Sequence, residues 1–191
     1  MPNPNAPFGL KPIRDAASAP YNDGTDAFAL LAADNTTVYI GDPVVISGNA
    51  DADGTPSAVL ATAGAGNRIT GAVVGFAPNP GIVSAGFRAG GNAVHALVEH
   101  NPDQLYEVQA NGVINAADIG LNANLVAGVL GNAYRLSGWQ LDSASIATTA
   151  TLQVRIVGLA RRPDNEFGAN AVVLVRINQT TETGAAGSTG V

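Results

Sequence analysis

The sequence contains no cysteine, a single lysine (Lys11) and few charged residues of either sign. Without cysteine there is no disulfide framework and no thiolate chemistry. Charged residues make up 13% of the 191 residues, about half the share of an ordinary soluble domain. Because charge is depleted at the cores of protein interfaces, this scarcity favours a surface that faces other subunits. A secreted or simply low-charge domain is the alternative interpretation of the same composition.

Basic residues are scattered along the chain. The net charge is −6, and among the nine basic residues only Arg161 and Arg162 are adjacent. Nucleic-acid binding needs a basic stripe, and binding to a membrane surface needs a polybasic segment. The sequence therefore predicts neither partner. Residues 1–9 have no basic region and no apolar run, so we expect no signal peptide and synthesis in the cytoplasm.

Short apolar and β-branched runs, separated by Gly, Pro, Asn and Asp, are abundant. About ten such runs, with at most one short helical stretch over 116–121, predict an all-β fold, either a jelly roll or a β-sandwich or barrel. Prolines at 2, 4, 7, 12 and 20 predict an extended N-terminal arm over 1–20. We expect a single β domain over 21–178 and a low-complexity tail over 179–191.

The densest β-branched content lies near the end of the chain, where 148–159 and 171–177 are each predicted to be one strand of a core hairpin. Three further local patterns give specific predictions. Residues 93–99 alternate with period two if Val98 or a bulge corrects the pattern. The glycines of 69–76 favour bulges or a close backbone approach. Asn111-Gly112 is a strong type I′ hairpin signal, weakened by the helix-like stretch that follows.

Several chemical motifs are incomplete. Asp51-Ala52-Asp53-Gly54 begins like a calcium loop, but Pro56 and Thr62 stand where glycine and glutamate are required. The glycines of 64–71 have the wrong spacing and context for a dinucleotide fingerprint. His95 and His100, five residues apart, match no standard zinc spacing. We therefore expect no catalytic residues, no metal site, no cofactor and no enzymatic activity.

Recognition of another protein is one hypothesis for two segments. For the arm over 1–20, a mobile terminus is the alternative. In the link between the predicted hairpin strands, residues 160–170, the arginines would donate to carboxylates on a partner and Phe167 would be an apolar anchor. Self-paired surface charges are the alternative for this link. The predicted contact residues in the arm and the link are Asn3, Pro4, Phe8, Lys11, Arg14, Arg161, Arg162, Glu166 and Phe167.

The order of several short motifs resembles the head decoration, or cement, proteins of tailed bacteriophages. The resemblance runs from residue 3 to about 178, and it rests on residues 2–14, 41–44, 71–76, 101–109 and 162–168. It implies a jelly roll or β-sandwich without enzymatic activity. It also implies a homo-oligomer, a dimer or trimer, on the outside of the capsid. There it would bind the major capsid protein over joints between subunits and resist the pressure of packaged DNA.

Two other functional classes remain open at this point. One is a different virion component, such as a tail, baseplate or major capsid protein. A major capsid protein of the usual tailed-phage fold would need a long helix, which this sequence does not predict. The other is a carbohydrate-binding or carbohydrate-hydrolysing β-sandwich, for which Trp139 and four tyrosines could form a sugar platform.

Overall fold

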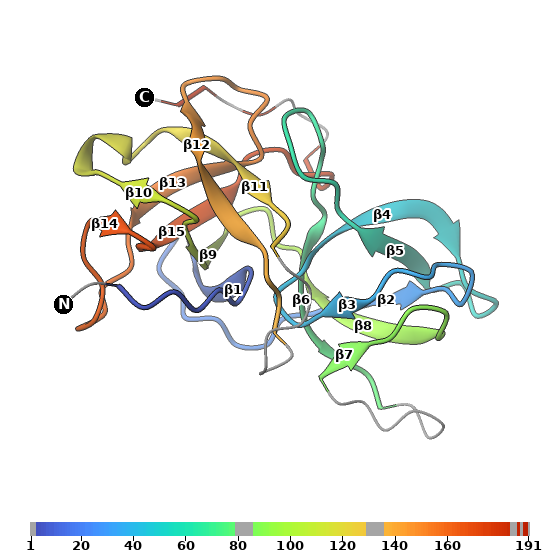
Figure 1. The fold of residues 1–191 in the computed structure, drawn as a ribbon. Helices are drawn as coiled ribbons and strands as arrows, with labels where there is room; N and C mark the ends of the chain where they lie inside the picture. The colour runs from blue at the N-terminus through green and yellow to red at the C-terminus, as the bar shows by residue number, and fades with distance from the viewer. Residues whose placement is uncertain (1–2, 79–85, 129–135, 184–186, 188, 191) are drawn as a thin grey trace.

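The computed structural model describes residues 3–78, 86–128, 136–183, 187 and 189–190. Within these residues the chain forms fifteen strands in four sheets, and its only helical element is the 3₁₀ turn Ala116–Asp118. The prediction of an all-β fold is confirmed. Eleven strands have five or more residues and four have only two, so the structure holds more strands than the sequence predicted. Figure 1 shows that they gather into two lobes.

The larger lobe is built on an antiparallel six-stranded sheet. Its strand order is β1 (Lys11–Asp15), β9 (Gln104–Gln109), β15 (Val172–Ile177), β13 (Val154–Leu159), β11 (Asn122–Val126) and β12 (Gln140–Ala147). The sheet curls, so that the N–H of Asn111, just beyond β9, donates to the carbonyl of Leu141 in β12 at 3.0 Å. Inside it, Tyr106, Val108, Ile156 and other apolar side chains are fully buried.

The smaller lobe contains a closed barrel. Its strand order is β2 (Asp26–Leu30), β5 (Pro56–Leu60), β4 (Pro43–Ala50), β6 (Gly71–Phe76) and β8 (Val94–Glu99). Phe28, Leu30, Val44 and Val98 belong to its separate apolar core. Two short ribbons complete the fold: β3 (Val38–Tyr39) with β7 (Phe87–Arg88), and β10 (Val113–Ile114) with β14 (Gly168–Ala169).

Several local predictions are confirmed. The antiparallel pair β13–β15 lies inside the six-stranded sheet and contributes much of its core, as expected for the hairpin strands. In β8 the side chains of Val94, Ala96 and Val98 are buried, so Val98 completes the period-two pattern. The pairing of β6 with β8 shifts register between Val73 and Gly75, which is the bulge that the glycines of this strand favour.

Three local predictions are wrong or only partly right. Residues 148–153 form turns between β12 and β13, so the strand predicted over 148–159 begins only at Val154. Neither Asn111 nor Gly112 has a positive φ, and β9 and β10 are not paired to each other. The helix-like stretch 116–121 is reduced to one 3₁₀ turn. In each case tertiary hydrogen bonds replace the local preference.

Gln153 explains the first of these corrections. Its side chain is fully buried, and its Oε1 accepts hydrogen bonds from the backbone N–H groups of Gly64 (3.0 Å) and Leu125 (3.1 Å). Its Nε2 donates to the carbonyls of Thr62 (2.9 Å) and Asn67 (3.2 Å). The amide thus uses its full hydrogen-bonding capacity. It joins the β5–β6 connection of the barrel to β11 of the larger lobe.

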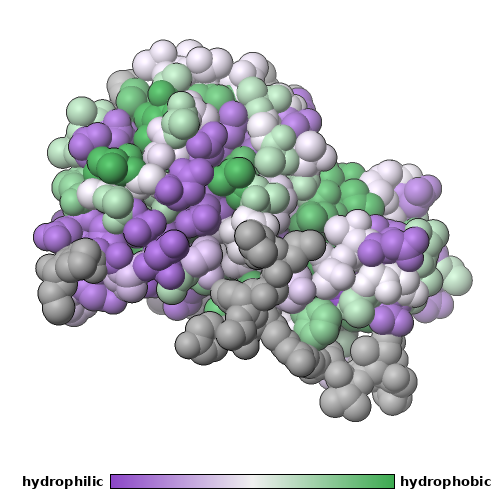
Figure 2. All heavy atoms as spheres, viewed as in Figure 1, coloured by the Kyte–Doolittle hydropathy of each residue, from purple (hydrophilic) through white to green (hydrophobic). Residues whose placement is uncertain are grey.

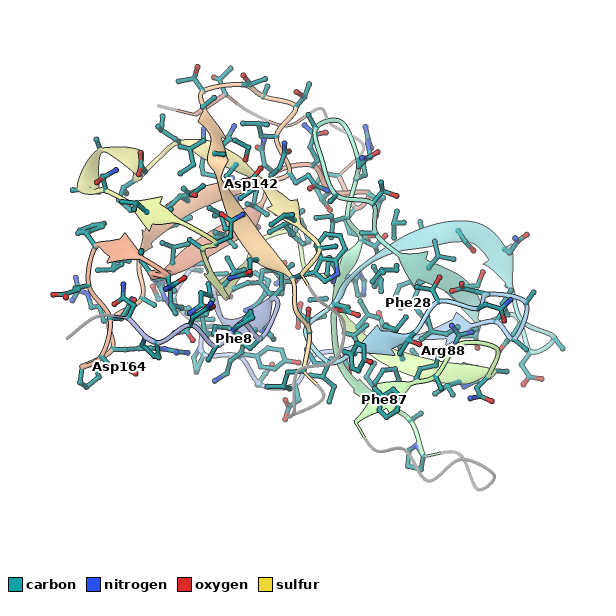
Figure 3. All side chains as sticks on the ribbon, in the orientation of Figure 1. Phe8, Phe28, Phe87, Arg88, Asp142 and Asp164 are labelled. Carbon is teal, nitrogen blue, oxygen red and sulfur yellow. The ribbon has the colours of Figure 1, made fainter. Side chains whose placement is uncertain are left out.

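Buried Arg88 joins segments within the smaller lobe, as Gln153 does between the lobes. Its guanidinium donates to the carbonyls of Leu31 and Asp34, both at 2.6 Å, and its Nε to the carbonyl of Asn92 at 2.8 Å. Figure 3 shows it in this lobe beside Phe87. Burial lowers its pKa, and the Asp34 carboxylate 3.5 Å away opposes that shift. Arg88 therefore stabilises two loops and is not available to a ligand.

The two lobes and the N-terminal segment meet where Gly9 crosses Gly41. Leu10 N–H donates to Gly41 O at 2.8 Å, and Gly41 N–H donates to Val73 O in β6 at 2.7 Å. Both glycines have positive φ, +75° and +93°. A Cβ on Gly9 would lie 2.2 Å from Gly41 O, and one on Gly41 would lie 2.2 Å from Phe8 O. Only glycine permits so close a backbone approach.

We expect Gly41→Ala to destabilise the protein by about 3–5 kcal/mol, because left-handed strain and a backbone clash add. Gly48→Ala is the matched control, since Gly48 has φ +78° but no atom within 4 Å of an added Cβ. Its cost should be about 1–2 kcal/mol. Urea unfolding of both variants measures the difference, and equal losses would contradict the proposed crossing.

Candidate interaction surface

The predicted arm and the predicted link lie together on the larger lobe. The side chain of Asn3 donates to the carbonyls of Glu166 (2.9 Å) and Ala169 (2.8 Å), and its Oδ1 accepts from the N–H of Glu166 (2.9 Å). These bonds join residues 163 and 166 positions apart in the sequence. Two segments that were predicted separately as contact regions therefore form one surface. Figure 3 shows Phe8 and Asp164 on this side of the lobe.

Buried Gln109, at the end of β9, holds the start of the arm. Its Nε2 donates to the carbonyls of Pro4 (2.6 Å) and Asn170 (3.2 Å), and its Oε1 accepts from the N–H of Ala6 (3.1 Å). Sequence reasoning missed this residue. The alternation of β9 gave no signal for it, because Gln109 shares a face with Glu107, opposite the core residues Tyr106 and Val108. Its amide is bonded because the arm lies against this face.

Residues 11–15 of the arm continue as β1, the edge strand of the six-stranded sheet. Leu10 is 1% exposed and belongs to the core of the larger lobe. The described part of the predicted arm is thus packed on its own chain. Residues 1–2 of the predicted arm and residues 184–186, 188 and 191 of the predicted tail lie outside the described residues.

Arg162 is bound within the chain. Its guanidinium pairs with the Glu107 carboxylate of β9, and its central carbon lies 5.4 Å from the centre of the Phe8 ring. Such a position allows both an ion pair and a cation–π contact. Of the two adjacent arginines predicted to bind a partner, Arg161 is the exposed one. For Arg162 the alternative interpretation of the link is therefore correct, because its charge is paired within the chain.

The other predicted contact residues are distributed over the same lobe. Lys11 is exposed on β1, and Arg14 donates to Ser18 Oγ at 3.1 Å within the following turn. Phe167 is 43% exposed and directly precedes β14. The partner strand of β14 carries Val113, which is 56% exposed. The link and the neighbouring strand β10 therefore present one exposed apolar side chain each, next to the charged side chains of the link.

An apolar groove of about 560 Å³ runs between the arm and the barrel; we call it the arm groove. It is lined by Phe8, Leu10, Lys11, Pro12, Tyr21, Asp23, Ile40, Gly41, Val73, Val74, Leu136 and Arg162. A second hollow of about 310 Å³, bounded by Asn3, Pro4 and Asp164 among others, shares Phe8 and Arg162 with it. Hydrophilic residues gather around the arm and link in Figure 2. The surface is thus an apolar groove with a polar border.

Asp42 lies under this groove and is fully buried. Its Oδ2 accepts a hydrogen bond from the N–H of Tyr39 at 2.8 Å. Burial raises its pKa to about 6, although the Ser137 hydroxyl and the Tyr39 N–H favour the charged form. The junction of the two lobes therefore contains a carboxyl group that titrates near neutrality.

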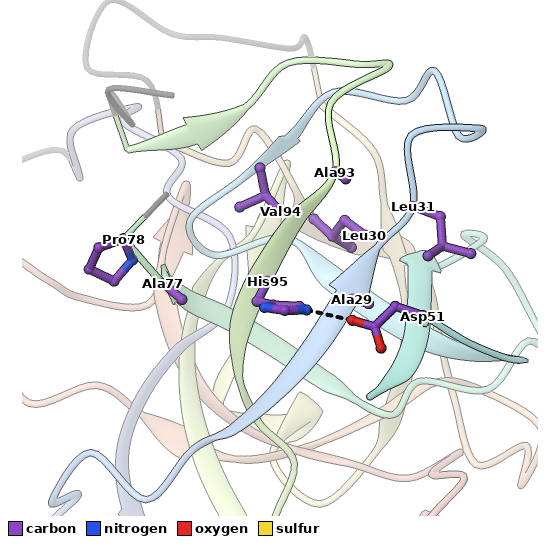
Figure 4. A pocket seen from close by; sticks show the side chains of 9 residues that line it. All are labelled: Ala29, Leu30, Leu31, Asp51, Ala77, Pro78, Ala93, Val94 and His95. Atoms are coloured by element: carbon purple, nitrogen blue, oxygen red, sulfur yellow. Dashed lines mark hydrogen bonds and ion pairs between the residues drawn. The ribbon is translucent and has the colours of Figure 1, made fainter. Parts of the chain in front are cut away.

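A separate hollow of about 380 Å³ lies on the barrel (Figure 4). His95 in β8 and Asp51 meet at one wall, with Nε2 and Oδ2 2.7 Å apart. The hydrogen bond from His95, followed by that from the Thr55 N–H, lowers the pKa of Asp51. Asp51 also accepts from the N–H of Asp53, so the segment that only begins like a calcium loop is a hydrogen-bonded turn. His100 lies elsewhere, between Asp26 and Glu182.

Within the described ranges, no group of three or more His, Cys, Asp or Glu side chains is arranged to hold a metal ion. No helix among the described residues is long and apolar enough to cross a membrane. Of the side chains that the carbohydrate hypothesis would use, Trp139 and Tyr106 are 2% and 0% exposed, and Tyr21 and Tyr39 are half-buried. Tyr134 lies outside the described residues. Comparisons with protein-family models, curated proteins and solved structures give no match.

The packing of the arm predicts unequal roles for the two adjacent arginines. Arg162→Ala should lower the free energy of unfolding by about 1–2 kcal/mol, because it removes the contacts with Glu107 and Phe8. Exposed Arg161→Ala, the control, should change it by less than about 0.5 kcal/mol. Urea denaturation compares the two, and a larger loss for Arg161→Ala would contradict the observed pairing.

Asp42 predicts a dependence of stability on pH. Its folded pKa of about 6 exceeds the ordinary 3.8, so its contribution is most favourable below pH 3.8 and is lost as the pH rises through 6. Asp42→Asn lacks this titration. The stability of wild type relative to Asp42→Asn should therefore fall by on the order of 3 kcal/mol between about pH 4 and about pH 7.5. A constant difference across this range would contradict the shifted pKa.

Proposed function

We propose that the protein is a capsid decoration protein that binds the outer surface of a phage head. One structural observation carries the proposal. Arm and link, two segments on which the resemblance to decoration proteins rests, form one ordered surface around the arm groove. An apolar centre with a polar border is typical of protein–protein interfaces. The low charge of the chain and the exposed side chain of Phe167 support the same proposal.

The proposed partners are the major capsid protein and further copies of this chain, as a dimer or trimer. The arm groove and the link would bind across the joint between neighbouring capsid subunits. Many copies on one capsid would give high total avidity even if each contact were modest. The protein would then have no enzymatic activity and would act on the virion exterior by resisting expansion of the shell.

The finer fold expectation, a jelly roll or β-sandwich, belongs with this proposal. The curled six-stranded sheet with its interior core would supply the layered part of such a fold, and the closed barrel would be a second lobe beside it. The link and the arm lie against the layered part. We therefore propose that the larger lobe faces the capsid.

Co-sedimentation with capsids stripped of the protein tests this function. Wild type should bind at a fixed stoichiometry, and Phe167→Ser should weaken binding by about tenfold, as expected for the loss of an apolar anchor. The matched control is Ile46→Ser in β4 of the barrel, because Ile46 is also 43% exposed. This control should bind like wild type.

The outcomes separate the function from the assigned surface. If wild type does not bind capsids and does not raise their resistance to heat, the decoration function is wrong. If wild type binds and both variants bind equally well, the function stands and the assigned surface is wrong. Binding to isolated tails, but not to heads, would instead support the other virion component considered above.

A further inference from the structure

His100 lies between two carboxylates that come from different parts of the fold. Its Nε2 is 2.8 Å from Asp26 Oδ2 at the start of β2, and its Nδ1 is 3.3 Å from Glu182 Oε2 beyond β15. Its ring and that of Phe28 pack edge to face, with ring centres 5.7 Å apart. The side chains of His100 and Glu182 are 28% and 30% exposed, so both are partly shielded from solvent.

This arrangement requires a doubly protonated ring. Ionised carboxylates only accept hydrogen bonds, and neutral imidazole carries a single N–H. When both ring nitrogens face carboxylates, both must donate, and the ring is then an imidazolium ion. After loss of one proton, a lone pair on the ring would face one of the two carboxylates and that contact would be lost.

The residue that His100 holds belongs to the segment 178–183, which crosses from β15 to the barrel; we call it the crossing segment. Ile69 N–H donates to Gln179 O at 2.8 Å, and Thr181 N–H donates to Ile69 O at 3.2 Å. The hydroxyls of Thr70 and Thr181 are 2.8 Å apart. Glu182 is the charged contact at the end of this series. Its Oε1 accepts from the Thr181 hydroxyl at 3.1 Å, and its N–H donates to Thr180 Oγ1 at 3.1 Å. Release from His100 would leave Glu182 held only by these local bonds at the end of the series.

We propose that His100 connects the crossing segment to the barrel in a pH-dependent way, holding Glu182 when the ring is charged and releasing it when the ring is neutral. The contact with Glu182 is the one that is lost, because its distance of 3.3 Å is longer than the 2.8 Å to Asp26. The neutral ring then keeps its single N–H on Nε2, where it donates to Asp26. The crossing segment then opens locally at Thr181, while the β15 strand before it remains in the sheet.

The direction of the pH effect follows from the groups around the ring. Burial lowers the pKa of His100, but the hydrogen bonds to Asp26 and Glu182 outweigh burial and raise it above 6.5. The adjacent Glu99 of β8 is buried, which raises its own pKa. The contact is therefore complete below pH 6.5 and is lost as the pH rises through the higher pKa of the folded state.

Two measurements on the full chain test the proposal: titration of the ring signals of His100 by NMR, and amide exchange of Thr181, expressed as protection so that the intrinsic pH dependence cancels. We expect the ring to titrate above 6.5 and the protection of Thr181 to fall about two- to fivefold over the same pH range. Glu182→Gln should lower the titration midpoint of the ring and show the reduced protection at low pH as well.

Two histidine variants complete the design. His100→Gln should show low protection of Thr181 at every pH, because a neutral amide cannot form the charged contacts. His95→Gln is the matched control, since His95 contacts Asp51 on the other side of β8, and it should leave the pH dependence unchanged. A ring midpoint at or below 6.5, or a pH dependence of Thr181 that persists in His100→Gln, would overturn the proposal.

Discussion

The contact between the backbones at Gly9 and Gly41 is the constraint on which the rest of the structure depends. Leu10 must enter the core of the six-stranded sheet, while Gly41 must bond to Val73 in the barrel. Both conditions hold only if the backbone segments at Gly9 and Gly41 touch. A Cβ at either glycine would occupy the same space as a carbonyl oxygen of the other segment. The crossing thus sets the position of the arm relative to both lobes. It also creates the groove between them.

A preformed surface has a consequence for binding. Because residues 3–15 are already hydrogen-bonded to β9 and to the link, a partner would not have to order them. Less conformational entropy is then lost on association than for a free arm. A decoration protein that binds by such a surface would recognise a shape that exists before contact, and would not need an arm that folds onto its neighbour.

Many of the charged side chains in this sparsely charged protein contact a side chain of opposite charge within the same chain. Several of the few charged side chains are paired inside the chain: Arg162 with Glu107, Arg176 with Asp103 and Arg88 with Asp34. Both histidines also contact carboxylates. Arg88 and Glu107 are shielded in these pairs, whereas Arg176 and Asp103 stay on the surface with side chains 38% and 67% exposed. Because charged residues make up only 13% of the sequence, the surface carries few charges. That surface suits wet protein–protein contacts better than electrostatic attraction.

The sequence by itself determined the all-β class, the alternation of β8 and the bulge in β6, because these features follow from side-chain periodicity and glycine content within a few residues. It also marked the arm and the link as unusual segments. Only the tertiary structure decided that these segments meet, that Arg162 is paired, and that Gln109 and Gln153 hold distant loops. The physical reason is that a buried amide or an ion pair takes partners dozens of residues away. Local propensity carries no information about such partners. The bonds of Gln153 displaced the first part of the strand expected over 148–159. At Asn111-Gly112 the expected hairpin does not form, and the Asn111 N–H donates to Leu141 in β12 instead.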